Sequence, residues 1–142
     1  MNTYLSITFD NCVVKSIYPE IIEDVPHAEQ VLKKLVAAGV HIILTTLRSR
    51  MKPITNVVSF YTFPHDNTLT PAVEWFNSRD IPLHGVNYNP EQSYWTNSTK
   101  PYATYVIDPR AIGCPTIPYD HGRYVDWMAI EKFFYKNKIL TV

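Results

Sequence analysis

A chain of 142 residues, 46% hydrophobic and 18% charged, has the length of one ordinary domain and the composition of a folded protein, which excludes an intrinsically disordered chain. Thirteen basic residues balance thirteen acidic ones, so no net field favours nucleic acid or an anionic membrane as a partner. No run approaches the roughly 18 apolar residues of a membrane span, and Cys12 and Cys114 belong to no metal-spaced set. We therefore expect one cytoplasmic domain over residues 1–142, whose partner is a small molecule.

Short apolar runs rich in β-branched and aromatic residues predict buried strands over residues 4–9, 40–46 and 103–108. Residues around Leu83 and Ile117 are weaker strand candidates, and prolines restrict the second to a sheet edge. Helical spacing of apolar residues predicts a helix over 28–36, which ends before Gly39. A second helix is expected to begin with Thr70 as its N-cap, and a third to run from about Tyr124 to Lys136.

This alternation of strands and helices favours an α/β fold with a mainly parallel sheet and right-handed crossovers. In such sheets ligands bind beyond the carboxyl ends of the strands. The residues that follow the predicted strands are 8–12, 46–48 and 108–110, and Lys100 shortly precedes the last strand. Carboxylates can hold a hard divalent cation there, while hydroxyl and backbone N–H groups can hold phosphate oxygens. The pattern is typical of phosphoryl transfer.

The segments "SITFDNCVV", "HIILTTLRS" and "KPYATYVIDPRAIGCP", in this order and at this spacing, resemble the haloacid dehalogenase-like hydrolase superfamily. The resemblance is to small members that have no separate cap domain. It implies a three-layer Rossmann-like fold with helices on both faces of the sheet. It also implies magnesium-dependent hydrolysis of a small phosphate ester.

The resemblance assigns roles to individual residues. Thr8 matches the position of the nucleophilic aspartate, Asp10 the general acid and base, and Lys100 the charge-neutralising lysine. Asp108 and the backbone oxygen of Asp10 are the expected ligands of a weakly bound Mg²⁺. The expected substrate-binding residues are Thr46, Arg48 and Asn11.

Two functional elements of this family are altered in the sequence. Thr8 is a neutral hydroxyl where the family has a carboxylate, and Pro109 replaces the second acid of the acidic pair. A threonine needs a base to become a nucleophile, so we expect weakened chemistry and weakened Mg²⁺ binding. Asp10 lies two residues along the same strand and could serve as that base. A shifted register, with Asp10 as nucleophile and Cys12 as the second position, is the alternative, although cysteine is a poor magnesium ligand.

Two interpretations of function stay open. One is a magnesium-dependent phosphohydrolase with impaired chemistry, and the other is a catalytically silent relative that binds a phosphorylated ligand or a protein partner. Asp10 and Asn11 are also a common turn pair, which offers a purely structural interpretation. The long aromatic segment 49–69 could cover the site or form a contact between identical subunits.

Overall fold

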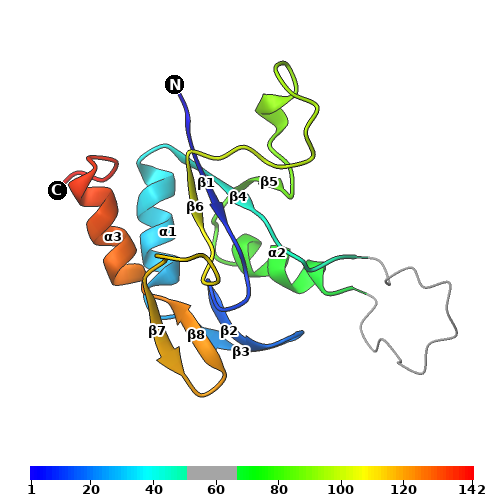
Figure 1. The fold of residues 1–142 in the computed structure, drawn as a ribbon, viewed down its shortest axis with the longest axis vertical. Coiled ribbons are helices and arrows are strands. Elements are labelled where there is room, and N and C mark those ends of the chain that lie inside the picture. Colours follow the sequence, from blue (N-terminus) through cyan, green and yellow to red (C-terminus); the bar gives the residue numbers. More distant parts are fainter. Residues whose placement is uncertain (51–66) are drawn as a thin grey trace, which may run out of the picture.

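The computed structural model describes residues 1–50 and 67–142 and contains a four-stranded, entirely parallel sheet. The strand order is β5-β4-β1-β6 (Figure 1), so β1 lies between β4 and β6. The four strands match the sequence expectation in place, with bounds β1 Thr3–Ile7, β4 Val40–Leu44, β5 Leu83–Val86 and β6 Tyr105–Ile107. The mixed α/β class with a parallel sheet is therefore confirmed.

Two antiparallel hairpins lie beyond the end of the sheet at which β1 finishes (Figure 1). The first joins β2 (Val14–Ile17) to β3 (Glu20–Asp24), and the second joins β7 (Thr116–Tyr119) to β8 (Gly122–Val125). Only β7 was predicted, because the other three strands are short and lack a continuous apolar alternation. Most of the segment 49–69 falls within residues 51–66, which lie outside the described residues.

Three helices complete the described regular structure apart from a short 3₁₀ turn, Pro90–Gln92: α1 Ala28–Ala37, α2 Leu69–Asn77 and α3 Trp127–Lys136. The predicted start of α2 at Thr70 was late, because the Asn67 side chain accepts the Thr70 N–H (3.0 Å) and the helix begins at Leu69. The predicted start of α3 was early, because Tyr124 belongs to β8 and Asp126 caps the helix by accepting the Ala129 N–H (3.2 Å). None of these helices, in the part of the chain that is described, is long and apolar enough to cross a membrane.

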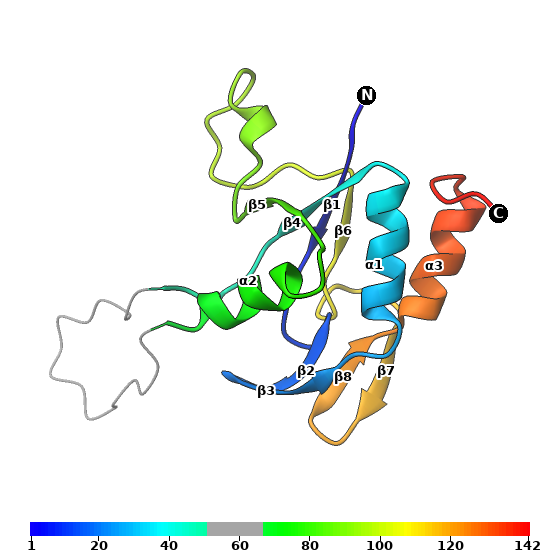
Figure 2. The ribbon, with the colours of Figure 1, turned by 180° about the vertical axis from the view of Figure 1, so that it is seen from behind.

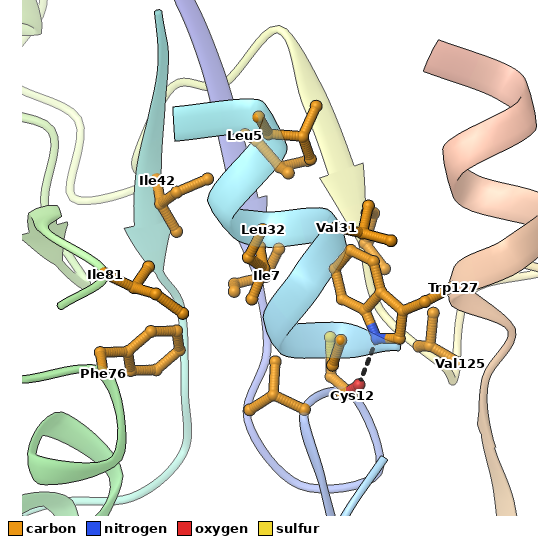
Figure 3. Packing of buried hydrophobic residues seen from close by; sticks show 14 of the residues in the cluster. Leu5, Ile7, Cys12, Val31, Leu32, Ile42, Phe76, Ile81, Val125 and Trp127 are labelled. Atoms are coloured by element: carbon orange, nitrogen blue, oxygen red, sulfur yellow. Dashed lines mark hydrogen bonds between the residues drawn. The ribbon is translucent and has the colours of Figure 1, made fainter. Parts of the chain in front are cut away.

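The hydrophobic core lies on the face of the sheet that carries Leu5 and Ile7 (Figure 3). The parallel register places Ile42 and Tyr105 beside Leu5, on the same face. Helices α1 and α3 stand side by side there (Figure 2) and are joined by an ion pair between Lys34 and Glu131 at 3.0 Å.

All three described helices contribute to this one core. Val31 of α1, Phe76 of α2 and Phe134 of α3 belong to the same buried cluster as the sheet residues. The opposite face receives other contacts, for example between the rings of Tyr4 and Tyr102, whose centroids are 6.1 Å apart. The arrangement with helices on both faces, expected from the sequence, is thus not confirmed by the described residues.

Candidate functional site

A pocket of about 820 Å³ opens where β1, β4 and β6 end. The chain moves from β1 to β4 and β5 on one side and then crosses to β6 on the other, so the strand order reverses next to β1. Crevices at such a reversal are the usual ligand sites of open α/β sheets. The pocket is lined by Thr8, Phe9, Asp10, Asn11, Tyr18, Thr45, Thr46, Leu47, Asn87, Asp108, Pro109, Arg110 and Arg123. Three separate sequence segments predicted for the site therefore meet in it.

A smaller hollow of about 340 Å³ lies within the segment from Asn87 to Pro101. Its lining residues are amides, hydroxyls, one tyrosine and one proline, and none of them is charged. It therefore lacks the acids and bases that chemistry or anion binding requires. The larger pocket at the strand ends is the candidate site.

Asp10 does not present a free carboxylate to this pocket, because Arg48 binds both of its oxygens. Arg48 Nε lies 2.9 Å from Asp10 Oδ2, and Arg48 Nη2 lies 2.6 Å from Asp10 Oδ1. The same guanidinium donates to the carbonyl oxygens of Thr68 and Pro19, each at 3.0 Å, and it lies over the ring of Phe9. Its charge is thus neutralised and fully engaged within the protein.

The predicted substrate-binding role of Arg48 finds no support in this geometry. The residue is only 2% exposed, and it does not line the pocket. Its position after β4 suggested a ligand contact, but the sequence does not show that the side chain turns inward toward Asp10. Arg48 is therefore a structural anchor that fixes the loop after β1 against the loop after β4.

Thr8 lies at the end of β1 and lines the pocket. Its buried hydroxyl oxygen has no hydrogen-bond partner among the described residues. The neighbouring Cys12 is fully buried, and burial raises the pKa of its thiol well above the ordinary value. Trp127 Nε1 donates to the Cys12 carbonyl oxygen at 2.7 Å, which holds this residue in the core (Figure 3). Cys12 is thus placed away from the pocket, and the register in which it acts as an acid has no geometric support.

Thr46 and Asn11 are the predicted phosphate-holding residues that the structure does bring to the pocket. The Thr46 N–H donates to Asn87 Oδ1 at 2.8 Å, and the Thr46 hydroxyl accepts the Arg48 N–H at 3.1 Å. The hydroxyl proton of Thr46 is then still available to a ligand oxygen. Asn11 adopts a positive φ of 58°, and its Oδ1 accepts the Tyr119 hydroxyl at 2.6 Å, which ties the loop to the β7–β8 hairpin.

Asp108 faces the pocket after β6, whereas Lys100 does not reach it. Asp108 Oδ1 accepts the Arg110 N–H at 2.9 Å, and the exposed guanidinium of Arg110 lies 3.4 Å from the same carboxylate. Lys100 is exposed and precedes Thr104, whose N–H donates to Tyr4 near the amino end of β1. The segment that carries Lys100 lies at the end of the molecule opposite the hairpins (Figure 1). The whole length of β6 thus separates Lys100 from Asp108, and the expected neutralising lysine is absent from the pocket lining.

Arg123 is a pocket residue that the sequence did not single out. It lies on β8, and it donates through Nε to Thr116 Oγ1 (2.7 Å) and through Nη2 to the Thr116 carbonyl oxygen (3.2 Å). The turn sequence before it, which includes Gly122 at a φ of 133°, is the signal that could have predicted the hairpin. Only the folding of that hairpin toward the end of β1 brings Arg123 to the site.

The donor set fits a resident Mg²⁺ poorly. Magnesium prefers near-octahedral oxygen coordination, usually with one or two free carboxylates. In residues 1–50 and 67–142, no three histidine, cysteine, aspartate or glutamate side chains are grouped so that they could hold a metal ion. Asp10 and Asp108 are the two acidic lining residues, and each already accepts hydrogen bonds from an arginine. Asp108 and the backbone carbonyl of Asp10 are then the oxygens left for a metal in the described part of the pocket, and Arg110 already lies beside Asp108.

Comparison with known proteins supports the fold but names no activity. No protein-family model matches the chain, and no curated protein matches it. A solved structure from Bacteroides thetaiotaomicron, described as that of a conserved protein coded by a locus, is similar to it with 27% identity and a TM-score of 0.68. The similarity covers 97% of this chain and 93% of the other chain. The haloacid dehalogenase-like assignment stays a prediction from the motifs.

Proposed function

We propose that this chain is a haloacid dehalogenase-like protein that binds a small phosphorylated molecule in the pocket and does not hydrolyse it efficiently. We also place its sheet in the Rossmann-like class, because the order β5-β4-β1-β6 reverses next to β1 at the pocket. The described helices α1, α2 and α3 pack on the face of the sheet that carries Leu5 and Ile7. The third layer of the expected three-layer arrangement would have to cover the opposite face.

The observation that carries the proposal is the pairing of Asp10 with Arg48. A general base must have a free oxygen within reach of the proton that it removes. Both Asp10 oxygens accept hydrogen bonds from Arg48, at 2.6 and 2.9 Å. The pairing fixes the orientation of the Asp10 carboxylate, and among the described residues the Thr8 hydroxyl makes no hydrogen bond to Asp10 or to any other group. No base is therefore in place to take the proton of Thr8 for an attack on phosphorus.

The size of the resulting defect follows from transition-state energetics. Loss of a nucleophile commonly lowers the rate by several powers of ten, and each power of ten is about 1.4 kcal/mol. Thr8 in place of a carboxylate, together with Pro109 in place of a second acid, thus removes roughly 4 kcal/mol or more of transition-state stabilisation. Binding of the phosphate group does not require a carboxylate at position 8 or at position 109.

The remaining pocket groups are suited to hold a phosphate. The Thr46 hydroxyl can donate to a phosphate oxygen, and Arg110 and Arg123 bring two guanidinium groups to the same pocket. Arginine binds phosphate oxygens through paired, charge-assisted hydrogen bonds. These donors support recognition without a reaction.

A second candidate function is slow magnesium-dependent hydrolysis of a phosphate ester. It is favoured by one observation: Thr8, Asp10, Thr46 and Asp108 line one pocket in the order of the family's motifs. A bound Mg²⁺, held by Asp108 and the loop of Asp10, would stabilise charge on the phosphoryl group. Hydrolysis would then require that a free lone pair of Asp10 come within hydrogen-bond reach of the Thr8 hydroxyl, with which it makes no contact among the described residues.

One experiment separates the two functions. Binding of phenyl phosphate is measured by calorimetry, and phosphate release is measured with excess Mg²⁺, for the native protein, Asp10→Asn and the double variant Thr8→Asp with Pro109→Asp. Asp80→Asn is the matched control, because Asp80 is exposed, lies outside the pocket and has a positive φ that asparagine tolerates.

We expect the native protein to bind the ester without releasing phosphate, and the double variant to gain magnesium-dependent release. Native release that disappears in Asp10→Asn but persists in Asp80→Asn would instead establish the hydrolase. A native protein that neither binds nor hydrolyses any of a panel of phosphate esters would refute both functions.

A further inference from the structure

We propose that the pocket binds the phosphate group of its ligand without a metal ion, through Arg123 and Arg110, with the neutral Thr8 as the position that makes this possible. The inference rests on the proposed binding function. It adds the charge state of the ligand and the side chains of this chain that contact it. It assigns to arginine the electrostatic part that Mg²⁺ has in the hydrolase family. Its ligand class is a phosphate monoester dianion.

The balance of charge around the pocket supports an anionic ligand. Among the described residues, two carboxylates, those of Asp10 and Asp108, face three guanidinium groups, those of Arg48, Arg110 and Arg123. Arg48 pairs with Asp10 and Arg110 with Asp108, so one positive charge remains. A phosphate monoester dianion offsets this charge, and Arg110, whose guanidinium contacts with Asp108 are long at 3.4 Å, can share its second negative charge.

Arg123 is the guanidinium that carries this excess charge. Its two hydrogen-bond acceptors among the described residues are both on Thr116, a hydroxyl and a carbonyl oxygen, and no carboxylate in that part of the chain forms an ion pair with it. The two hydrogen bonds to Thr116 orient the planar group but leave its charge uncompensated. A preoriented arginine loses little side-chain freedom when it binds an anion in a paired geometry.

Thr8 removes the repulsion that normally makes a metal necessary. A carboxylate at this position would face the phosphate dianion as a like charge, and a divalent cation between them would offset that repulsion. Thr8 is neutral, and in the described part of the chain its buried hydroxyl has no hydrogen-bond partner. A ligand oxygen would supply that partner after rotation of the side chain about its Cα–Cβ bond, since Thr8 lines the pocket.

A purely structural role for Arg123 is the alternative that the test must exclude. In that case Arg123 only joins the two strands of the β7–β8 hairpin through Thr116. Thr116→Val removes the hydroxyl acceptor but keeps the guanidinium charge at the pocket. A structural role predicts that Thr116→Val and Arg123→Gln behave alike, whereas a binding role separates them.

The experiment measures binding of inorganic phosphate and of phenyl phosphate by calorimetry, once in excess EDTA and once in excess Mg²⁺. The variants are Arg123→Gln, Arg123→Lys, Thr116→Val and Thr8→Asp. Lys132→Gln is the matched control, because it removes one positive charge from an exposed site on α3 outside the pocket. Urea unfolding of each variant shows whether the fold is retained.

We expect equal native affinities in EDTA and in Mg²⁺. Arg123→Gln should weaken binding about tenfold or more, as expected for the loss of charge-assisted hydrogen bonds, and should flatten the salt dependence of the affinity. Arg123→Lys should bind with an affinity between those of the native protein and Arg123→Gln. Thr116→Val loses one of the two orienting hydrogen bonds but keeps the charge, so it should weaken binding much less than Arg123→Gln does. Lys132→Gln should bind as the native protein does. Thr8→Asp should lose affinity in EDTA and recover it in Mg²⁺.

Native binding that requires Mg²⁺ would overturn this inference and leave the proposed binding function in place. Unchanged affinity in a folded Arg123→Gln variant, or equal losses in Thr116→Val, would also overturn it. Absence of binding under both conditions would refute the proposed function itself, so the two failures are distinguishable.

Discussion

The pairing of Arg48 with Asp10 can be tested by a double-mutant cycle. Asp10→Asn and Arg48→Met are made separately and together. Arg48 is 1% exposed and Asp10 27% exposed in their side chains, so each single variant leaves a charge that water reaches poorly. Removal of one partner of a buried pair costs about 3–5 kcal/mol, and the partial exposure of Asp10 reduces the expected loss to about 3 kcal/mol for each single variant.

The coupling energy isolates the pair from the other contacts of Arg48. Arg48→Met also loses the hydrogen bonds to the Thr68 and Pro19 carbonyl oxygens, but this loss occurs in the single and in the double variant and cancels in the cycle. The double variant has neither charge left unpaired. We therefore expect its loss of stability to be about 2 kcal/mol smaller than the sum of the two single losses.

The assay is urea unfolding followed by tryptophan fluorescence and by circular dichroism, with coincident transitions as the check for two-state behaviour. Losses that add to within about 0.5 kcal/mol would show that the two side chains are energetically independent. Asp10 would then be free to act as an acid or base, and the argument for a silent site would fail.

Three further predictions concern the frame that supports the site. Trp127→Phe should lower the free energy of unfolding by about 1–3 kcal/mol in urea, because it orphans the buried Cys12 carbonyl oxygen, and an unchanged midpoint would contradict the assigned bond. Gly85→Ala should be strongly destabilising by thermal melting, because the new Cβ would lie 1.9 Å from the Tyr88 carbonyl oxygen, whereas Gly39→Ala, with no atom in the way but a φ of 90°, should cost only backbone strain. Burial raises the pKa of the Cys12 thiol, so above about pH 9 the unfolded chain loses a proton that the folded chain keeps, and stability should fall by about 1.4 kcal/mol per pH unit; a Cys12→Ala variant with the same slope would refute this cause.

Much of the fold could be predicted from the sequence because its signals are local. The strands over residues 4–9 and 40–46 are continuous apolar runs, and the helix over 28–36 shows a regular apolar spacing. The hairpin strands β2, β3 and β8 lack such a pattern, since β2 and β8 have only four residues each, β3 is exposed throughout, and all three depend on pairing with a neighbour. Their existence is decided by tertiary contacts that no local pattern contains.

The candidate site was predictable only in part, for a similar reason. Thr8, Asp10, Thr46 and Asp108 follow predicted strands, and the parallel sheet brings the ends of those strands together. Lys100 was placed by its distance in sequence, but the segment from Asn87 returns to the amino end of β6 before the strand begins.

The positions of Arg48 and Arg123 could not be predicted from the sequence. Arg48 follows its strand at a position typical of a ligand contact, yet its side chain turns inward to Asp10. Arg123 reaches the pocket from a hairpin more than a hundred residues after Asp10 in the chain. The direction of the side chain decides the role of Arg48, and the folding of a distant hairpin decides the position of Arg123. The spacing of motifs in the sequence predicts neither.

The most direct test of a binding site without efficient turnover follows the ³¹P resonances of phenyl phosphate mixed with the native protein. We predict that the ester resonance shifts or broadens in excess EDTA, and that no inorganic phosphate resonance grows after excess Mg²⁺ is added. Steady growth of inorganic phosphate with the native protein, and its absence with Asp10→Asn, would contradict the account.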